Sequence, residues 1–483
     1  MSLQILVQGK LLGIEEFLTT PLDAPDESVA ARSLWISLVC EVVPRALLAE
    51  FELARVLLGS SGGGQFLLVL PDAIRGKAEE FLARAASQIA EASKHKVRLV
   101  WAVTENLGDW TVVRKRLQDE MTLKGSTPLA QARSFEPLPP EEPAETIFTA
   151  EFLQDLRSAQ SIGWSGELPA IITTGVAKHT WPLTANLSLE GITVARHVAL
   201  NEDGGSATTE ELAARAEGQR AWGALRGDVD LFSLRLRRLQ SIEEHVRLSM
   251  LYKQFFAGEL NVLSLQGDFW QRITVLFSGG DDFAVYGSWN ALVLFANELQ
   301  RTFHRFADEN LADFPGAEAK TVTMALALAG PGETLASTFE RAGRNLALAK
   351  SSDKDCIWAF DRVVEWKQLS VAADLKEAVA RVSDEFKAAG RQFVSELTRL
   401  YVKASTAGET QSDHERLLRR AYRFQRRYNR AANSKREREF RKLRDHLIGE
   451  IVGRNIRPAA GKQLRLRPAG VIALEWARMS KGV

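Results

Sequence analysis

The spacing of apolar and polar residues in the first hundred positions switches between strand-like alternation and helix-like periodicity. In chain order the pattern predicts a strand, a helix kinked at Pro44, two strands, a second helix and a final strand. The expected ranges are residues 4–8, 30–51, 55–58, 66–70, 74–93 and 97–103. This β-α-β-β-α-β order is typical of the split βαβ, ferredoxin-like fold.

The same order returns in the middle of the chain, which indicates an internal duplication. The second copy is expected to have strands at 221–226, 273–277, 283–286 and 322–328, a helix ending near Gly258 and a helix at 292–309. The strand-turn-strand segments also align residue by residue, Ser61-Gly62-Gly63-Gly64-Gln65-Phe66 with Ser278-Gly279-Gly280-Asp281-Asp282-Phe283. Two adjacent carboxylates therefore exist only in the second copy.

The regions outside the two copies differ from them in composition. Residues 137–143 form a Pro-rich break inside a stretch of little periodicity, which indicates a linker with a small insert. Residues 370–450 are rich in Leu, Ala, Glu, Lys and Arg and contain no proline, which favours a helical domain. The sequence thus predicts an α+β protein of four parts, at residues 1–114, 115–220, 221–369 and 370–483.

Composition narrows the class of protein. The 62 Lys and Arg residues nearly cancel the 61 Asp and Glu residues, so the net charge of +1 indicates no particular partner. The apolar stretch from Leu34 to Val43 is interrupted by Glu41, and no apolar run approaches the roughly 18 residues of a membrane span, so no membrane partner is expected. Cys40 and Cys356 provide neither a disulfide framework nor a Cys-based zinc site, and residues 1–10 lack the features of a signal peptide. A cytoplasmic location is therefore expected.

The strongest candidate chemistry lies in the hairpin of the second copy. A Gly-Gly turn between two apolar strands presents Asp281 and Asp282 at one end of a sheet. Asp228 closes the first strand of this copy, and the first and third strands of this fold are central neighbours, so the three carboxylates are expected to converge. Carboxylates and phosphate oxygens are the ligands that Mg²⁺ prefers, and two ions would activate an attacking hydroxyl and neutralise a leaving pyrophosphate. The alternative is a solvated hairpin turn without chemistry.

Several segments together resemble one protein family. They are Lys10 to Phe17, Ala31 to Trp35, the two Gly-Gly hairpins, Thr208 to Ala214 leading into Leu225 to Asp230, and Leu251 to Gly258. In this order they are similar to the large Palm-domain subunit of type III CRISPR interference complexes, the Cas10 family, most closely its Csm branch. The resemblance implies two Palm domains of the cyclase or polymerase type, an insert between them and a C-terminal helical domain. It also implies conversion of ATP into cyclic oligoadenylate when target RNA binds.

The resemblance also implies roles for individual residues. Asp228, Asp281 and Asp282 would hold two Mg²⁺ or Mn²⁺ ions, with Asp230 as a further candidate ligand. The nucleotide-binding positions would be Ser249 near the adenine, Lys350 at the triphosphate, and Ser278, Gly279, Gly280, Ser61, Gly62, Gly63 and Gly64 around two pockets. For Ser249 and Lys350, ordinary polar residues on a helix remain an equal alternative.

The chain also departs from this family. Most members begin with an HD nuclease domain, whereas this chain starts almost directly in the first Palm and none of its seven histidines is followed by Asp. The DNA-cutting activity implied by the family is therefore expected to be absent. Residues 149–200 contain no cysteine, so the zinc element that many members carry between the Palms is also expected to be absent.

A stretch near the C-terminus concentrates positive charge. Between Arg416 and Arg444 there are 13 basic residues, and the acidic ones are Glu437 and Glu439. Helical spacing places five arginines on one stripe, Arg416, Arg420, Arg423, Arg427 and Arg430, beside an apolar stripe of Leu417, Ala421, Phe424 and Tyr428. Arginine suits phosphates and carboxylates in fixed geometry, so guide RNA, target RNA or an acidic neighbouring subunit is the expected partner. The alternative is a solvated face.

Three functions remain open from the sequence. The first is a metal-dependent nucleotidyltransferase that makes cyclic oligoadenylate from ATP within a complex of guide RNA and other type III subunits. The second is a catalytically idle scaffold that binds guide RNA and partner subunits. The third and most distant is a diguanylate cyclase, whose signature is similar to Gly279 to Phe283.

Overall fold

The computed structural model describes residues 3–126, 147–184, 188, 190–314, 316–352, 354–405, 411–428, 435–451 and 467–481. The chain divides into two compact units, the first comprising residues 1–215 and 221–346 and the second residues 216–220 and 347–483. The expected boundary at 114/115 falls within α4 (Trp110–Ser126), and that at 369/370 falls within α12 (Trp366–Glu385). The described residues contain no helix that is both long and apolar enough to cross a membrane.

The first copy of the repeated pattern forms an antiparallel sheet in the order β2-β3-β1-β4. Its strands are β1 (Gln4–Leu12), β2 (Leu58–Gly62), β3 (Gln65–Pro71) and β4 (Arg98–Glu105). Its helices are α1 (Ile14–Thr19), α2 (Asp26–Glu50) and α3 (Arg75–Ala92), followed by α4 against β4. The expected order of strands and long helices is therefore present, with the short α1 added.

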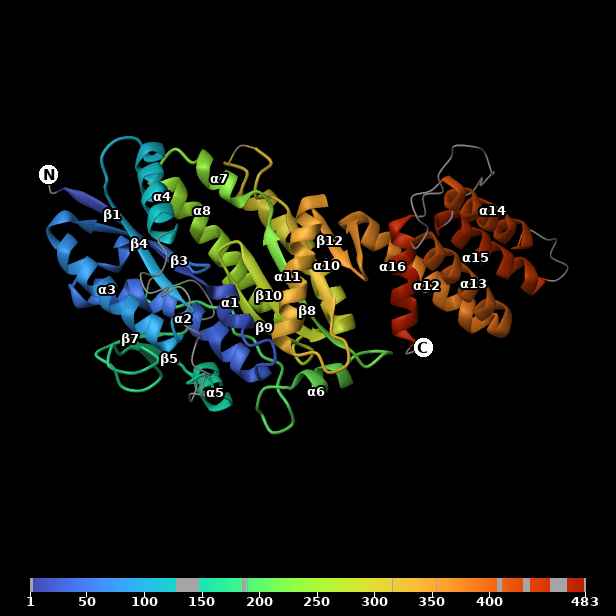
Figure 1. Ribbon diagram of the computed structural model, residues 1–483, viewed down its shortest axis with the longest axis horizontal. Coiled ribbons are helices and arrows are strands. Elements are labelled where there is room, and N and C mark those ends of the chain that lie inside the picture. The colour runs from blue at the N-terminus through green and yellow to red at the C-terminus, as the bar shows by residue number, and fades with distance from the viewer. Residues whose placement is uncertain are drawn as a thin grey trace, which may run out of the picture. The chain divides into compact units, whose positions relative to one another are not determined.

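The second copy forms a sheet that within the first unit has the order β11-β8-β10-β9. Its strands are β8 (Trp222–Val229), β9 (Ile273–Gly279), β10 (Asp282–Ser288) and β11 (Val322–Leu328). Its helices are α7 (Phe232–Arg238), α8 (Ile242–Lys253), a π-helical turn (Gln254–Glu259), α9 (Leu260–Ser264), α10 (Trp289–Asn310) and α11 (Leu335–Ser352). The helix α10 packs against β8, β10 and β11 (Figure 1).

Two sequence predictions about these elements are wrong. Residues 55–57 form a 3₁₀ turn rather than a strand, since Val56 is exposed and the sheet begins only at Leu58. The helix expected to end near Gly258 continues through the π-helical turn into α9 and ends at Ser264. Gly258 lacks the positive φ of a glycine that terminates a helix, so its presence in the sequence was misleading.

The helix α2 connects the two copies. It is apolar on nearly every face, which is the pattern of a helix buried on all sides. One hydrophobic core joins it to both sheets, and the Ser33 hydroxyl donates a hydrogen bond to the Leu276 carbonyl of β9 at 2.8 Å. Figure 1 shows α2 beside β9, although the two lie far apart in the sequence. The two copies therefore share one core.

The insert between the copies belongs to the first unit. It contains α5 (Ala150–Ser158), a sheet in the order β6-β5-β7 and the capped helix α6 (Thr209–Ala214). The sheet strands are β5 (Ser161–Trp164), β6 (Ile172–Thr173) and β7 (His179–Pro182). Trp35 of α2 packs edge-on against Phe148 and donates its indole N–H to the Ala170 carbonyl at 2.8 Å. Apolar packing against α2 therefore holds this insert.

The second unit is mostly helical. After the end of α11 it contains the hairpin of β12 (Cys356–Ala359) and β13 (Arg362–Glu365). Its helices are α12, α13 (Lys387–Ser405), α14 (Gln411–Tyr428), α15 (Lys435–Ile451) and α16 (Pro468–Ser480). The helix α12 packs against α13, α15 and α16 through buried residues such as Leu375, Leu397 and Trp476. This packing gives the second unit a core of its own.

Candidate functional site

The glycine hairpins of the two copies meet at the centre of the first unit. A Cβ atom added to Gly63 would lie 3.1 Å from the Gly280 Cα atom and 3.2 Å from the Gly279 carbonyl oxygen. Gly63 and Gly280 both have positive φ, 57° and 70°, which side chains rarely adopt. Glycine is therefore needed at these positions both for the turns and for the close approach of the two backbones.

Two of the expected carboxylates lie directly opposite each other. In the pairing of β10 with β8, Asp282 is the partner of Asp228. Directly opposite residues of an antiparallel pair project from the same face, so these two side chains are neighbours. Asp281 belongs to the turn, where its carbonyl accepts a hydrogen bond from the Val229 N–H at 2.9 Å. The structure thus brings Asp228 and Asp282 together and places Asp281 in the turn beside them.

This pair suits a magnesium ion that is completed by a substrate. Within the described ranges, no three His, Cys, Asp or Glu side chains cluster closely enough to hold a metal by themselves. The expected role of Asp281 as a third ligand stays a prediction. Mg²⁺ usually takes one or two carboxylates and obtains its other ligands from water and substrate phosphates. Like charges directly opposite on neighbouring strands also repel, and a cation between them relieves that repulsion. The chemistry of Asp228 and Asp282 therefore fits such an ion.

Asp230 occupies a different environment from the pair. Its side chain is buried, and it accepts hydrogen bonds from the hydroxyls of Thr321 and Thr323, both at 2.8 Å. Its backbone also forms hydrogen bonds with the Thr321 and Ala319 backbones. These contacts tie the end of β8 to β11, so they favour a structural role for Asp230 over the metal-binding role considered from the sequence.

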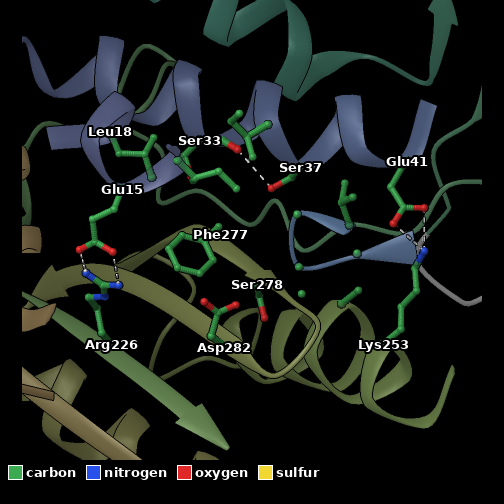
Figure 2. A pocket seen from close by; sticks show the side chains of 18 of the residues that line it. Glu15, Leu18, Ser33, Ser37, Glu41, Arg226, Lys253, Phe277, Ser278 and Asp282 are labelled. Atoms are coloured by element: carbon green, nitrogen blue, oxygen red, sulfur yellow. Dashed lines mark hydrogen bonds and ion pairs between the residues drawn. The ribbon is translucent and has the colours of Figure 1, made fainter. Parts of the chain in front are cut away.

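A cavity of about 180 Å³ opens beside Asp282 (Figure 2). It is called the larger cavity here only by contrast with a pocket of about 70 Å³ that also borders the hairpin contact. Its walls come from α2, from the turn at Gly62 to Gly64 and from Phe277, Ser278 and Gly279 of β9. Ser278 is buried, and its hydroxyl donates to the Phe256 carbonyl at 2.6 Å. This bond fixes the end of β9 against the π-helical turn, and such turns frequently occur at functional sites.

Ion pairs lie at opposite ends of the larger cavity in Figure 2. At one end Arg226 donates to Glu15 at 2.7 and 3.2 Å and stacks on the Phe339 ring, 4.2 Å from its centroid. At the other end the Lys253 ammonium donates to both carboxylate oxygens of Glu41 at 2.7 Å. Each pair joins a helix of the first copy to an element of the second, so both pairs hold the copies together around the cavity.

Ser249 lines a different space, here called the smaller pocket. This pocket encloses about 70 Å³ and is also lined by Ser61, Gly62, Lys253 and Gly280. His245 lines it too, and burial, with the nearby charge of Arg114, lowers the pKa of its imidazole to about 4, so the ring is neutral at pH 7. Two spaces therefore border the hairpin contact, and Gly62 lines both.

Lys350 is not among the residues that line these spaces. It lies in the last turn of α11, within the second unit, and is partly buried. Its expected contact with a triphosphate stays a prediction.

The basic stripe is present on the described part of α14. Arg416, Arg420, Arg423 and Arg427 are exposed, whereas Arg430 lies outside the described residues. The buried residues of this helix include Leu418, Ala421 and Phe424. Leu418 is an addition to the expected apolar stripe. Two expected members of that stripe, Leu417 and Tyr428, have side chains that lie outside the part of the chain that the structure describes.

Between α13 and α14 lies a groove of about 420 Å³. It is lined by Arg399, Arg420, Arg423 and Arg427, together with Glu396, Leu400 and Phe424. Arg427 pairs with Glu396 at 2.9 Å. The groove thus also contains Arg399 of α13, which the predicted stripe, confined to one helix, did not include.

Four charged residues that line the larger cavity were not predicted from the sequence to belong to the site. They are Glu15, Glu41, Arg226 and Lys253. Glu41 had a signal in the sequence, since it interrupts the apolar stretch from Leu34 to Val43 and an acidic residue inside a buried helix requires a partner. Lys253, between aromatic residues of α8 and the π-helical turn, carried no comparable signal.

Two protein-family profiles match parts of the chain. One is described as "Cas10/Cmr2, second palm domain" and matches residues 221–358. The other is described as "Csm1 subunit domain B" and matches residues 3–110.

Curated relatives match shorter segments. The Cas10/Csm1 single-strand-specific deoxyribonuclease (subtype III-A) of Thermococcus onnurineus strain NA1 is 28% identical over 133 residues, covering 24% of this chain and 17% of that protein. The corresponding protein of Enterococcus italicus is 30% identical over 154 residues, covering 30% of this chain and 19% of that protein. The matched segments therefore span less than a fifth of each relative.

Solved structures match along nearly the whole chain. A Csm1–Csm4 cassette in complex with cA4 has a TM-score of 0.71 at 16% identity, and one in complex with AMPPNP has 0.71 at 17%. Csm1 of T. onnurineus has a TM-score of 0.64 at 17% identity. Each match covers 99% of this chain and 70% of the other chain. At such low identity the likeness concerns the fold.

Proposed function

Because the chain belongs to the Cas10 family of type III CRISPR subunits, we propose that it synthesises cyclic oligoadenylate from ATP as the large subunit of a type III effector complex. In this proposal the two copies in the first unit are Palm domains, and the second copy carries the catalytic residues. The observation that carries the proposal is the cross-strand pair of Asp228 and Asp282 beside a cavity bordered by the glycine turn of the other copy.

The proposed reaction joins two nucleotides held on either side of the hairpin contact. The 3′-hydroxyl of one ATP attacks the α-phosphorus of the other, a 3′-5′ phosphodiester bond forms, and the bond to pyrophosphate breaks. The hydroxyl proton passes to solvent. Repetition and a final intramolecular attack close the ring, so ATP alone supplies every atom of the product.

The chain contributes position and charge to this reaction. Asp228 and Asp282 would hold Mg²⁺ or Mn²⁺, which supplies a Lewis acid for the phosphates and the attacking oxygen. Gly62 to Gly64 and Gly279 to Gly280 have no side chains, so phosphates can approach their backbone closely. Ser278 donates its hydroxyl hydrogen to the Phe256 carbonyl, which keeps the turn in place, and its oxygen can still accept a hydrogen bond from a nucleotide.

The second unit supplies the proposed contact with RNA or a partner subunit. The groove between α13 and α14 presents arginines from two helices, and a planar guanidinium group binds phosphate through two parallel hydrogen bonds. An RNA backbone is favoured because phosphates repeat along it as the arginines do along α14. Among its described lining residues the groove has one aromatic side chain, Phe424, and that ring is buried, so the proposed contact is independent of base sequence.

The test uses the full chain assembled with its guide RNA and partner subunits. The complex is incubated with ATP, Mg²⁺ and target RNA, and the products are identified by mass spectrometry. The wild type is expected to form cyclic oligoadenylate, and Asp228→Ala and Asp282→Ala are each expected to reduce its rate by at least about a hundredfold. The matched control is Asp313→Asn, because Asp313 is an exposed aspartate of the same unit that pairs with Arg247.

Three results would contradict the proposal in different ways. A wild-type rate equal to that of Asp282→Ala would exclude catalysis at this pair. Intact RNA-guided interference by both aspartate variants, without any product, would favour the idle scaffold. Product formation from GTP but not from ATP would favour a diguanylate cyclase.

A further inference from the structure

The ion pair of Glu41 and Lys253 lies at the junction of three spaces. Lys253 lines both the larger cavity and the smaller pocket. It also lines a third space of about 210 Å³, here called the serine pocket, whose hydroxyls come from Ser60, Ser61, Ser188 and Ser249. One ammonium group is therefore within reach of every candidate nucleotide space around the hairpin contact.

The pair is deeply buried, which is costly for charged groups. The side chains of Glu41 and Lys253 are 2% and 12% exposed. Burial lowers the pKa of Lys253, and the Glu41 carboxylate opposes that effect. Burial alone would raise the pKa of Glu41, but the charges of Lys253 and Arg45 outweigh it, so that pKa lies below its ordinary value. A buried ion pair is often no more stable than apolar side chains of similar size, so stability alone does not explain it.

Glu41 has partners that would remain if Lys253 moved away. Arg45 donates to the carboxylate at 2.7 Å, and the Ser61 hydroxyl donates to it at 2.8 Å. The carboxylate would thus stay paired after losing the ammonium group. Lys253 is the last residue of α8, directly before the π-helical turn, and its ammonium group stands at the end of a flexible four-carbon side chain. The ammonium group can therefore shift without moving α8.

The surroundings of Lys253 favour an anion. The charged side chains that line the serine pocket are all cationic, Arg45, Arg55 and Lys253, among its described lining residues. Among the described residues that line the smaller pocket, Lys253 is the one with a charged side chain at pH 7, because His245 is neutral. In the larger cavity Arg226 already pairs with Glu15. Phosphate oxygens are the anions that match several hydroxyls and ammonium or guanidinium groups together.

We propose that Lys253 binds nucleotide phosphates at the junction of the three spaces, and that Glu41 is the counter-charge that holds its ammonium group until a nucleotide arrives. The assignment rests on the proposed function, because it adds a residue to the same nucleotide site. Phosphate and Glu41 compete for one cation, so the two residues have opposite effects on affinity. A purely structural clamp would instead need both residues equally.

The test measures binding of AMPPNP with Mg²⁺ to the full chain by calorimetry, which avoids turnover. Lys253→Met is expected to raise the Kd about tenfold or more, since it removes a charge-assisted hydrogen bond to phosphate. Lys253→Arg retains the charge and should restore part of the affinity. Glu41→Gln releases the ammonium group and should lower the Kd. Lys178→Met is the matched control, because Lys178 is an exposed lysine that pairs with Glu50, and its Kd should equal that of the wild type.

A double variant covers the case in which Glu41→Gln does not fold. Glu41→Gln/Lys253→Met removes both buried charges and should bind as weakly as Lys253→Met. Equal Kd values for Lys253→Met and the wild type would overturn the assignment. It would also be overturned if Glu41→Gln lost as much affinity as Lys253→Met does. Absence of binding by the wild type would contradict the proposed function itself, which distinguishes the two failures.

Discussion

The contact between the glycine hairpins can be tested by adding a single methyl group. In Gly63→Ala the new Cβ would lie 3.1 Å from the Gly280 Cα atom and 3.2 Å from the Gly279 carbonyl oxygen. Both neighbours are backbone atoms, so relief requires the two hairpins to separate by a few tenths of an ångström. The substitution therefore changes the geometry of the site without changing any charge.

The expected cost has two parts. A side chain at the positive φ of Gly63, 57°, costs roughly 1 to 2 kcal/mol. Inserting a methyl group into a packed contact adds about 1 to 2 kcal/mol. The free energy of unfolding should therefore fall by about 2 to 4 kcal/mol. Because small displacements of reacting groups have large effects on rate, oligoadenylate formation should fall by about tenfold or more.

The matched control is Gly76→Ala on α3. A Cβ there meets no atom within 4 Å, and Ala in a helix is roughly 0.5 to 1 kcal/mol more favourable than Gly. Stability is measured by urea unfolding and activity by product formation from ATP. If Gly63→Ala were as stable and as active as Gly76→Ala, the hairpin contact would not have the role assigned to it.

Two further predictions concern the remaining polar residues. Asp230→Ala should lower the free energy of unfolding, measured in urea, by about 2 to 4 kcal/mol, because the buried Thr323 hydroxyl and the partly buried Thr321 hydroxyl would lose their acceptor. Asp228→Ala leaves those bonds intact and should cost less, and equal costs would contradict the structural role of Asp230. Substituting Arg420 and Arg423 by Gln should make the affinity for single-stranded RNA less dependent on salt. In a plot of log affinity against log salt concentration, the slope should become shallower by about 0.7 for each phosphate that is no longer neutralised. Fluorescence anisotropy at several salt concentrations measures that slope, and a slope unchanged from that of Arg381→Gln, an exposed arginine of α12, would exclude the proposed RNA contact.

Local sequence signals predicted most elements of the first unit. The strand expected at 322–328 coincides with β11, and the helix expected at 74–93 differs from α3 by one residue at each end. Both rest on periodicity, which depends only on neighbouring residues. Two predictions differ from the structure because local patterns are misleading there. Periodicity assigns Val56 to a strand, but its side chain is exposed, and Gly258 suggests a helix end, but it lies within a π-helical turn.

The candidate site was only partly visible in the sequence. The Gly-Gly-Asp-Asp turn is a local signal, and it identified Asp281 and Asp282. The strand register places Asp282 opposite Asp228. Asp230, two residues further along than Asp228, is buried instead and accepts hydrogen bonds from Thr321, just before β11, and Thr323 in β11. Neighbouring carboxylates in one short segment thus received different environments, and no spacing rule separates them.

The sequence by itself determined the duplicated strand and helix order, the glycine turns and the arginine stripe, because each depends on residues within a few positions of one another. Only the tertiary structure decided that α2 packs against both copies, that the two glycine turns meet, and that Glu41 pairs with Lys253 across 212 positions of the chain. Burial and charge pairing act through space, so their partners are set by how the chain packs. The site is formed by that packing, where the glycine turns of the two copies meet without side chains between them.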